Sequence, residues 1–244
     1  MIPKFELQAV INKYYLNGLI EAVKWEIKDD KLNIKYASPS REMLGELIYD
    51  KINLPESTVG ISNTTQLIKL LSITTGDLML DYIKNGKTFS KLIISDNQFN
   101  VSYTLADILT VPKTGTYTGP EEYDVESNVD SDTITALIKA KSALPESTTV
   151  VIKPYESISG DAQIELMFGG DVEYANKVSY YVPTTVNKKS DYELHFNSDI
   201  LKEILSSNKD ATKAKIHINL EGLMKLEFYE ENIKSTYYIV KKND

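Results

Sequence analysis

The chain has 244 residues, and its 35 acidic side chains outnumber its 27 basic ones, which gives a formal net charge of −8. That balance argues against an ordinary nucleic-acid-binding protein, because such proteins attract phosphates with a basic surface. A content of 42% hydrophobic and 25% charged residues is typical of a globular protein and argues against disorder.

Three absences narrow the class of protein further. The apolar runs are far shorter than the roughly 20 residues that cross a bilayer, and residues 1–6 lack the pattern of a secretory signal. The sequence contains no cysteine, so disulfides, thiolate nucleophiles and cysteine-based zinc sites are excluded. We therefore expect a cytoplasmic protein without a membrane span.

Four segments show apolar residues at intervals of three and four, which predicts amphipathic helices. Gly18, Gly76 and Pro145 stand near the ends of the first three segments, where such residues commonly stop a helix. The predicted helices cover residues 3–17, 63–75, 131–144 and 198–209.

The remaining segments are short and rich in β-branched and aromatic residues, which predicts strands. Pairs such as Asp29-Asp30, Asn85-Gly86 and Glu221-Gly222 separate them and are typical of tight turns, so we expect antiparallel pairing. The predicted strands include residues 22–28, 31–37, 77–84, 91–95, 98–103, 163–168, 177–182, 213–218 and 234–240.

The order of predicted elements repeats once along the chain. A helix, several strands, a polar cap with a second helix, and more strands occur in residues 1–105 and again in residues 123–244. Residues 106–122, which are rich in Gly, Pro and Thr, are expected to connect the two copies over the surface. The sequence thus predicts an α+β fold of two similar domains, each an antiparallel sheet with two helices on one face.

Lysines are concentrated on the predicted helices, although the chain as a whole is acidic. The four helices carry seven lysines and only four acidic residues, and every other basic residue except Arg41 is also lysine. A solvated helix face is the simple explanation for any one of them. Lys141 fits such a face poorly, because it falls near the apolar stripe of its helix. The seven are Lys4, Lys13, Lys69, Lys139, Lys141, Lys202 and Lys209.

No pattern of residues indicates catalysis or a bound metal. His195 and His217 are the only histidines, and no carboxylate lies at a metal-ligand spacing along the sequence from either. Gly169-Gly170 and Asn85-Gly86-Lys87 lack the spacing of a phosphate-binding loop, and no nucleophile motif is present. We expect a protein that is not an enzyme and that needs no cofactor.

These features together resemble the sliding clamps of DNA polymerases. The resemblance rests on the duplication, on the capped helices that begin at Asn63-Thr64-Thr65-Gln66-Leu67 and Asn197-Ser198-Asp199-Ile200-Leu201, on the connector, and on the final strand Ser235-Thr236-Tyr237-Tyr238-Ile239-Val240. The bacteriophage trimeric clamp, related in fold to proliferating cell nuclear antigen, is the form that it resembles most. The resemblance covers essentially the whole chain.

The resemblance implies a homotrimeric ring that encircles double-stranded DNA and acts as a processivity factor for DNA polymerase, opened by a clamp-loader ATPase. If the chain is phage-encoded, it would work in the cytoplasm of a bacterial host. The helices of such a ring line the hole, so the seven helix lysines would face the DNA. A ring that cannot fall off needs only weak contacts with phosphates, which fits an acidic exterior.

The same resemblance assigns contacts between subunits and with partners. Edge strands would join neighbouring subunits through Phe99, Val101 and Tyr103 on one side and Val178, Tyr180 and Val182 on the other. Partner motifs would dock on Val111 and Pro112 of the connector and on Tyr238, Ile239 and Val240 of the last strand. Ordinary edge strands and internal packing are the alternative explanations for these residues.

Two other functions remain open from the sequence. The chain could be a β-rich interaction protein with no role on DNA, whose lysines serve only solubility. It could also be a monomeric or dimeric processivity factor that binds DNA by direct affinity. Measurement of the oligomeric mass distinguishes an interaction protein from a clamp, because a clamp should be a trimer. Salt-sensitive binding to short linear duplexes would identify a processivity factor that binds DNA by affinity.

Overall fold

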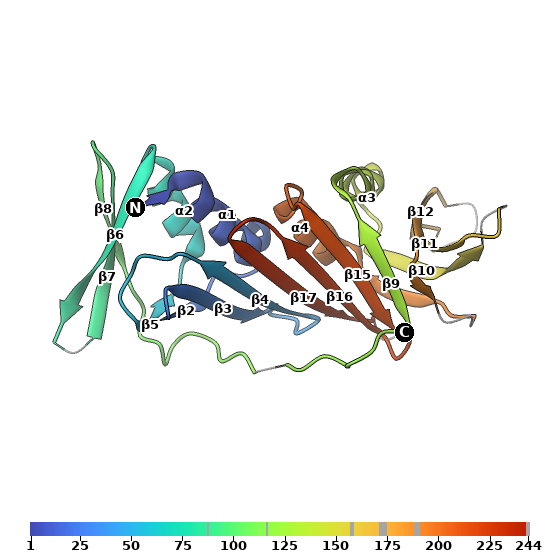
Figure 1. Ribbon diagram of the computed structural model, residues 1–244, viewed down its shortest axis with the longest axis horizontal. Coiled ribbons are helices and arrows are strands. Elements are labelled where there is room, and N and C mark those ends of the chain that lie inside the picture. Colours follow the sequence, from blue (N-terminus) through green and yellow to red (C-terminus); the bar gives the residue numbers. More distant parts are fainter. Residues whose placement is uncertain (87, 116, 157–158, 171–174, 188–190, 243–244) are drawn as a thin grey trace. The chain divides into compact units, whose positions relative to one another are not determined.

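The computed structural model describes residues 1–86, 88–115, 117–156, 159–170, 175–187 and 191–242 (Figure 1). The chain forms two compact units, and the main passage from one to the other falls at residues 116 and 117. Unit 1 comprises Met1–Pro39, Gly45–Thr116 and Asn232–Ser235, and unit 2 comprises Ser40–Leu44, Tyr117–Glu231 and Thr236–Asp244. None of the described helices combines the length and apolar character that crossing a bilayer requires.

Unit 1 contains two helices and two antiparallel sets of strands. The helices are α1 (Lys4–Tyr15), which a short 3-10 turn at Leu16–Gly18 follows, and α2 (Thr64–Ser72). One set, in the order β1-β6-β7-β8, consists of β1 (Ile2–Pro3), β6 (Asp77–Asn85), β7 (Thr88–Ser95) and β8 (Asn100–Thr104). The other, in the order β4-β3-β2-β5, consists of β2 (Val23–Lys28), β3 (Lys31–Ala37), β4 (Met43–Asp50) and β5 (Ser57–Ile61).

Unit 2 repeats this plan. Its helices are α3 (Ser131–Ala143) and α4 (Ser198–Ser207). The order β12-β11-β10-β14 joins β10 (Thr149–Glu156), β11 (Ala162–Gly169), β12 (Lys177–Pro183) and β14 (Leu194–Asn197). The order β13-β9-β15-β16-β17 joins β9 (Val125–Val129), β13 (Val186–Asn187), β15 (Lys213–Asn219), β16 (Leu223–Tyr229) and β17 (Ile233–Val240).

The two units correspond element by element. The helices α1 and α2 match α3 and α4. Strands β2, β3, β4 and β5 match, in this order, β10, β11, β12 and β14, and strands β6, β7 and β8 match β15, β16 and β17. Strand β13 is an addition to unit 2. The predicted α+β fold of two similar domains with antiparallel strands and two helices each is confirmed.

Polar residues cap three of the four helices, and two of them, Asn63 and Asn197, were predicted from the sequence. The Asn63 side chain accepts a hydrogen bond from the Gln66 N–H at 2.8 Å, and Asp130 accepts one from the Thr133 N–H at 2.8 Å. Asn197 accepts from two backbone N–H groups at the start of α4. These contacts satisfy donors that have no partner within the helix, which fixes where each helix begins.

Removal of the cap at α2 is expected to cost stability without changing the fold. Asn63→Ala deletes the acceptor for the Gln66 N–H, so the free energy of unfolding should fall by about 1 kcal/mol in urea denaturation. Asn63→Asp keeps an acceptor at the cap and should stay close to wild type. Equal stability of Asn63→Ala and wild type would show that α2 does not depend on this cap.

The helices bury the apolar stripes that the sequence predicts. Leu7, Val10, Ile11 and Tyr14 of α1 are fully buried, and α4 buries its leucines and isoleucines in the same way. In α2 and α3 the predicted stripe is buried only in part, because Leu70 and Ile138 are half-buried. Each fully buried side chain contributes roughly 1.5–3 kcal/mol by its removal from water. Trp25 of β2 is also fully buried, so it serves the core.

A glycine makes room for an aromatic ring between β3 and β4. Tyr36 of β3 is 1% exposed, and its hydroxyl donates to the backbone carbonyl of Lys13 in α1 at 3.2 Å. A Cβ on Gly45 of β4 would stand 2.1 Å from Cε2 of Tyr36. Only a residue without a side chain fits beneath that ring.

Candidate functional site

Five of the seven helix lysines reach solvent in the described structure, and one of these, the half-buried Lys4, is bound to a neighbouring helix. Lys69 of α2 and Lys139 of α3 are exposed, Lys202 lies half-buried on α4, and Lys209 is exposed just beyond the end of that helix. Each lies away from the buried stripe of its helix. These four, which we call the outer helix lysines, remain the predicted DNA-facing residues.

Lys4 is held by the end of a neighbouring helix. Its ammonium group donates to the carbonyl of Ser72 at 3.0 Å and to the carbonyl of Thr74, both at the C-terminal end of α2. The last carbonyls of a helix carry partial negative charge and lack partners within the helix, so a lysine stabilises them. Lys4 therefore joins α1 to α2, a contact that the sequence did not indicate.

The prediction that Lys13 and Lys141 face outward is wrong, because each is only 2% exposed. Lys13 follows Val10 by one turn and lies on the buried side of α1. The ammonium of Lys141 lies 2.9 Å from Oδ1 of Asp199 and donates to the Pro145 carbonyl at 2.9 Å. A cation in this position ties the end of α3 to the first turn of α4 and is not available to a duplex.

Strands β8 and β12, which carry most of the predicted subunit contacts, each lie at the end of their strand order. No described strand pairs with the outer edge of either. Pro183 ends β12. Proline has no N–H to donate to a neighbouring strand, so within sheets it is found mainly in edge strands and at strand ends. Both strands therefore present backbone groups that could accept another strand.

The side chains of these strands divide between core and surface. Phe99, just before β8, is 40% exposed, whereas Val178 and Tyr180 of β12 are half-buried. Burial raises the pKa of the Tyr103 hydroxyl, which bonds to the backbone of Asn63. The side chains of the following predicted interface residues instead belong to the core: Val101, Tyr103 and Val182.

An aspartate fixes the turn that leads into β8. Asp96 Oδ1 accepts from the N–H of Phe99 at 2.6 Å and of Gln98 at 2.7 Å, and Oδ2 accepts from the N–H of Thr75 at 2.6 Å. These backbone donors, Phe99 first, hold the pKa of the Asp96 carboxyl below its ordinary value of 3.8. The ionised form is thus the one that the folded turn favours.

The Asp96 turn is expected to make part of the stability depend on pH. Because folding lowers the pKa of this group, its contribution is complete above pH 3.8 and disappears as the pH falls through the lower folded value. Asp96→Ala should therefore be destabilised at pH 7, and its difference from wild type should shrink as urea unfolding is repeated toward pH 3. A difference that stays constant over this range would contradict the assignment.

The residues predicted to dock partners also divide between core and surface. In unit 1, Val111 is 3% exposed and packs against Gly60, whereas Pro112 is exposed. In unit 2, Ile239 of β17 is fully buried and Val240 is 45% exposed. The predicted docking role is therefore wrong for the side chains of Val111 and Ile239, which pack inside their own units.

The second half of the connector packs on β17 within unit 2. The rings of Tyr117 and Tyr238 meet edge to face at 4.8 Å. Gly119 of the connector lies so close to the rings of Tyr123 and Tyr238 that an added Cβ would stand 2.8 Å from the Tyr123 hydroxyl and 3.1 Å from Tyr238 Cε1. Tyr238 is thus half-buried beneath its own connector.

The structure contains a charged cluster around His217 that the sequence does not predict. Its ring nitrogens lie 3.4 Å from Glu126 of β9 and 3.1 Å from Glu227 of β16, and Lys225 lies 3.1 Å from Glu227. The cross-strand register of β9, β15 and β16 brings these residues together, and spacing along the chain cannot show it. Within the described part of the chain, no group of histidine, aspartate and glutamate has the geometry of a metal site.

Two backbone hydrogen bonds, one inside each unit, join segments that lie far apart in the sequence. In unit 1 the N–H of Asp50 in β4 donates to the Asn232 carbonyl at 2.9 Å, and in unit 2 the N–H of Val240 in β17 donates to the Glu42 carbonyl at 3.0 Å. By the correspondence of the units, β4 is equivalent to β12 and β17 is equivalent to β8.

Comparison with solved structures shows that this is the fold of the proliferating cell nuclear antigens. The antigen of Entamoeba histolytica matches 99% of the chain over 96% of its own length, with a TM-score of 0.77 and 18% identity. The A. fulgidus protein, solved with the C-terminal region of FEN-1, matches 100% of the chain over 97% of its length, with a TM-score of 0.78 and 14% identity.

A third match is the PCNA2–PCNA3 complex of Sulfolobus tokodaii, which covers 99% of this chain and 98% of the matched one at a TM-score of 0.77 and 14% identity. No protein-family model and no curated protein matches the sequence. The likeness therefore lies in the three-dimensional fold and extends over nearly the full length.

Proposed function

We propose that the chain is a DNA sliding clamp, a subunit of a homotrimeric ring that encircles duplex DNA and tethers a polymerase to its template. The full-length likeness to nuclear antigen structures and the duplicated units support this function. One such structure holds a complex of two clamp chains and another a segment of FEN-1, which are partnerships of those proteins.

The unpaired edges of β8 and β12 are the observation that carries the proposal. Strand β8 ends the order β1-β6-β7-β8 of unit 1, and β12 ends the order β12-β11-β10-β14 of unit 2. A second copy that places its β12 on β8 would join these two strand orders into one continuous sheet. Such a head-to-tail contact uses two different surfaces, so repeated copies close into a ring when the rotation permits.

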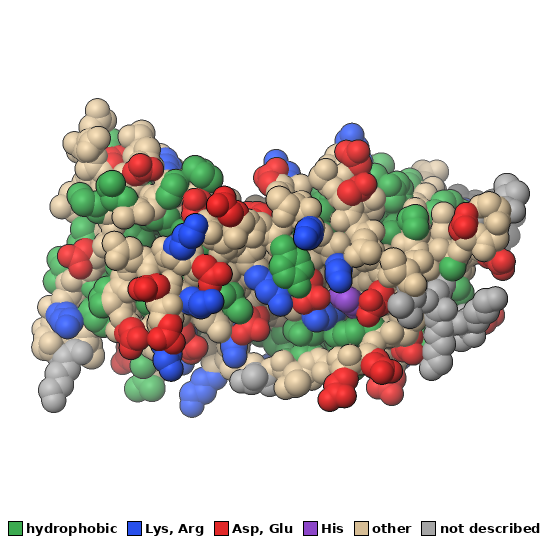
Figure 2. All heavy atoms as spheres, in the orientation of Figure 1, with side chains coloured by type: hydrophobic (Ala, Val, Ile, Leu, Met, Phe, Trp, Pro, Cys, Tyr) green, Lys and Arg blue, Asp and Glu red, His purple; other side chains and the backbone are tan. Residues whose placement is uncertain are grey.

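The charges of the helices suit an encircled duplex. Lysine is a mobile point charge, and the outer helix lysines would meet phosphates without reading base edges. On the face shown in Figure 2, acidic and basic side chains are mixed, which gives a duplex no continuous basic stripe to follow. A ring holds DNA by enclosing it, so weak contacts on the helices are sufficient.

Partners follow from the same proposal. A clamp-loader ATPase would open the ring, and DNA polymerase would dock on the exposed connector residue Pro112 and on Tyr238 and Val240 of β17. Such a ring works where its host keeps DNA and replication enzymes, which for a bacteriophage protein is the bacterial cytoplasm.

Loss of one outward N–H in β8 is expected to break the ring into monomers. Leu105 and Phe99 bond toward β7, so by the alternation of a strand the N–H of Ser102 faces the unpaired edge. The wild-type mass in solution should be three times 27.5 kDa. Ser102→Pro should reduce it to a single copy by light scattering, because proline cannot donate to a neighbouring strand.

Ser102→Ala is the matched control and should remain trimeric. Far-ultraviolet circular dichroism should show that both variants are folded, since the N–H that is lost does not serve the β7–β8 pairing. A wild-type monomer at micromolar concentration, or a trimeric Ser102→Pro, would exclude closure through this edge. Salt-sensitive binding of a monomer to short linear duplexes would instead identify a processivity factor that binds DNA by affinity.

A further inference from the structure

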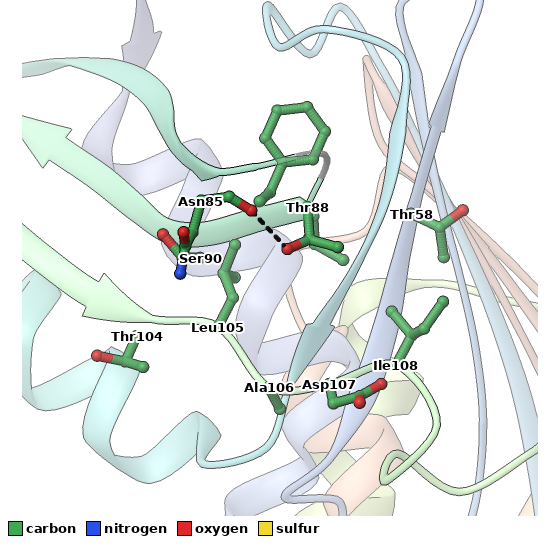
Figure 3. A pocket seen from close by; sticks show the side chains of 11 residues that line it. Thr58, Asn85, Thr88, Ser90, Thr104, Leu105, Ala106, Asp107 and Ile108 are labelled. Carbon is green, nitrogen blue, oxygen red and sulfur yellow. Dashed lines mark hydrogen bonds between the residues drawn. The ribbon is translucent and has the colours of Figure 1, made fainter.

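A cavity of about 510 Å³ opens on unit 1 between β5, the end of β6, the start of β7 and the segment after β8 (Figure 3). Its apolar walls come from Val59, Phe89, Leu105 and Ile108, and Leu105 and Ile108 rise into the space from the segment below. Asp107 is the only ionisable side chain among the residues that line it, all of which the structure describes. A volume of this size accommodates a bulky side chain with its backbone.

The edge of β5 beside the cavity is already used once by the chain itself. The N–H of Ala106 donates to the Gly60 carbonyl at 2.8 Å, which forms an isolated antiparallel bridge. Backbone groups of a strand alternate in direction, so Thr58, two residues from Gly60, also turns its N–H and carbonyl toward this side. Thr58 therefore offers a donor and an acceptor at the mouth of the cavity.

The chain leaves this edge immediately after the bridge. The N–H of Thr110 donates to the Asp107 carbonyl at 2.9 Å, and the N–H of Leu109 donates to Asp107 Oδ1 at 2.9 Å. This turn carries the backbone away from Thr58 and leaves Ile108 39% exposed and Leu109 80% exposed. The turn thus exposes two large apolar side chains beside a strand edge that it does not cover.

We propose that this cavity binds an extended peptide segment of a partner protein, which adds to β5 at Thr58. One apolar side chain of the segment enters the cavity, and a basic side chain next to it lies against Asp107. The outward backbone groups of Thr58 select an extended conformation, the apolar walls select the inserted side chain, and the single carboxylate selects the charge. None of the lining residues is among the predicted DNA-facing, docking or subunit-contact residues, although Thr104 belongs to β8, whose outer edge the proposed ring contact would use.

A synthetic capped hexapeptide, Thr-Val-Leu-Val-Lys-Thr, is the probe for this site, titrated into the full ¹⁵N-labelled chain. Amide shifts should concentrate at Thr58 and Ile108, with a dissociation constant of roughly 0.1–1 mM, as expected for a short weak contact. Replacement of the peptide leucine by serine, or of the following valine by proline, should weaken binding at least tenfold. A peptide with glutamate in place of lysine should bind several-fold more weakly.

Two protein variants localise the contact without touching the core. Ile108→Glu should weaken binding at least tenfold, whereas Ile73→Glu, which changes an exposed isoleucine next to the end of α2, should not. Asp107→Asn keeps a side-chain oxygen for the Leu109 N–H and should abolish the preference for the lysine peptide over the glutamate peptide. Absence of binding at millimolar peptide, equal binding of the proline peptide, or shifts that Ile108→Glu leaves unchanged would overturn the proposal.

Discussion

Simultaneous replacement of Lys69, Lys139 and Lys209 by glutamate is expected to reduce clamp-dependent DNA synthesis by roughly tenfold or more. All three are exposed and lie on or next to helices α2, α3 and α4. Reversal of their charge replaces attraction to phosphates by repulsion at each copy in the ring. Primer extension on a long circular template with loader and polymerase measures the effect, and light scattering should still show a trimer.

A matched variant separates position from net charge. Lys28, Lys213 and Lys215 are equally exposed but lie on strands, so their replacement by glutamate changes the net charge by the same amount. This control should support synthesis close to the wild-type level. If both triple variants behave alike, the outer helix lysines are not the surface that faces DNA.

Gly45→Ala is expected to lower the free energy of unfolding by about 3 kcal/mol, the largest effect of a single methyl group that we predict for this protein. The added Cβ would stand 2.1 Å from the buried ring of Tyr36, which is also held by its bond to the Lys13 carbonyl. Either the ring must leave its site or the two strands must separate. Urea denaturation measures the loss.

A double-mutant cycle tests the cause of this loss. Tyr36→Ala alone leaves a cavity, but in that background the methyl group at Gly45 has no ring to strike and should cost little. The two effects should therefore sum to more than the double variant shows. Additive losses would mean that Gly45 is required by its backbone and not by the ring above it.

The sequence was sufficient for the parts of the fold that depend on local signals. The apolar stripes and the caps Asn63 and Asn197 located the helices. The predicted end of α2 at Thr75 was three residues too late, because the helix ends at Ser72. Strands β4, β9, β10 and β16 were not among the predicted segments. Strand β4 shows why, because Gly45 disfavours a strand locally and is required only by Tyr36 of the neighbouring strand.

The candidate site was predictable only as far as exposure follows from periodicity. Lys69 and Lys139 lie opposite their stripes and are exposed, whereas Lys141 lies along its stripe and is buried against Asp199. Lys4 reaches the end of α2, a contact 68 residues away in sequence that no local pattern encodes. The His217 cluster depends likewise on strand register, which becomes known only when the sheet is assembled.

The unpaired edges of β8 and β12 have a consequence for a copy that stands outside a ring. Backbone groups at an open strand edge can pair with strands of other chains, so an isolated copy would be exposed to aggregation. Pairing with neighbouring copies would cover both edges.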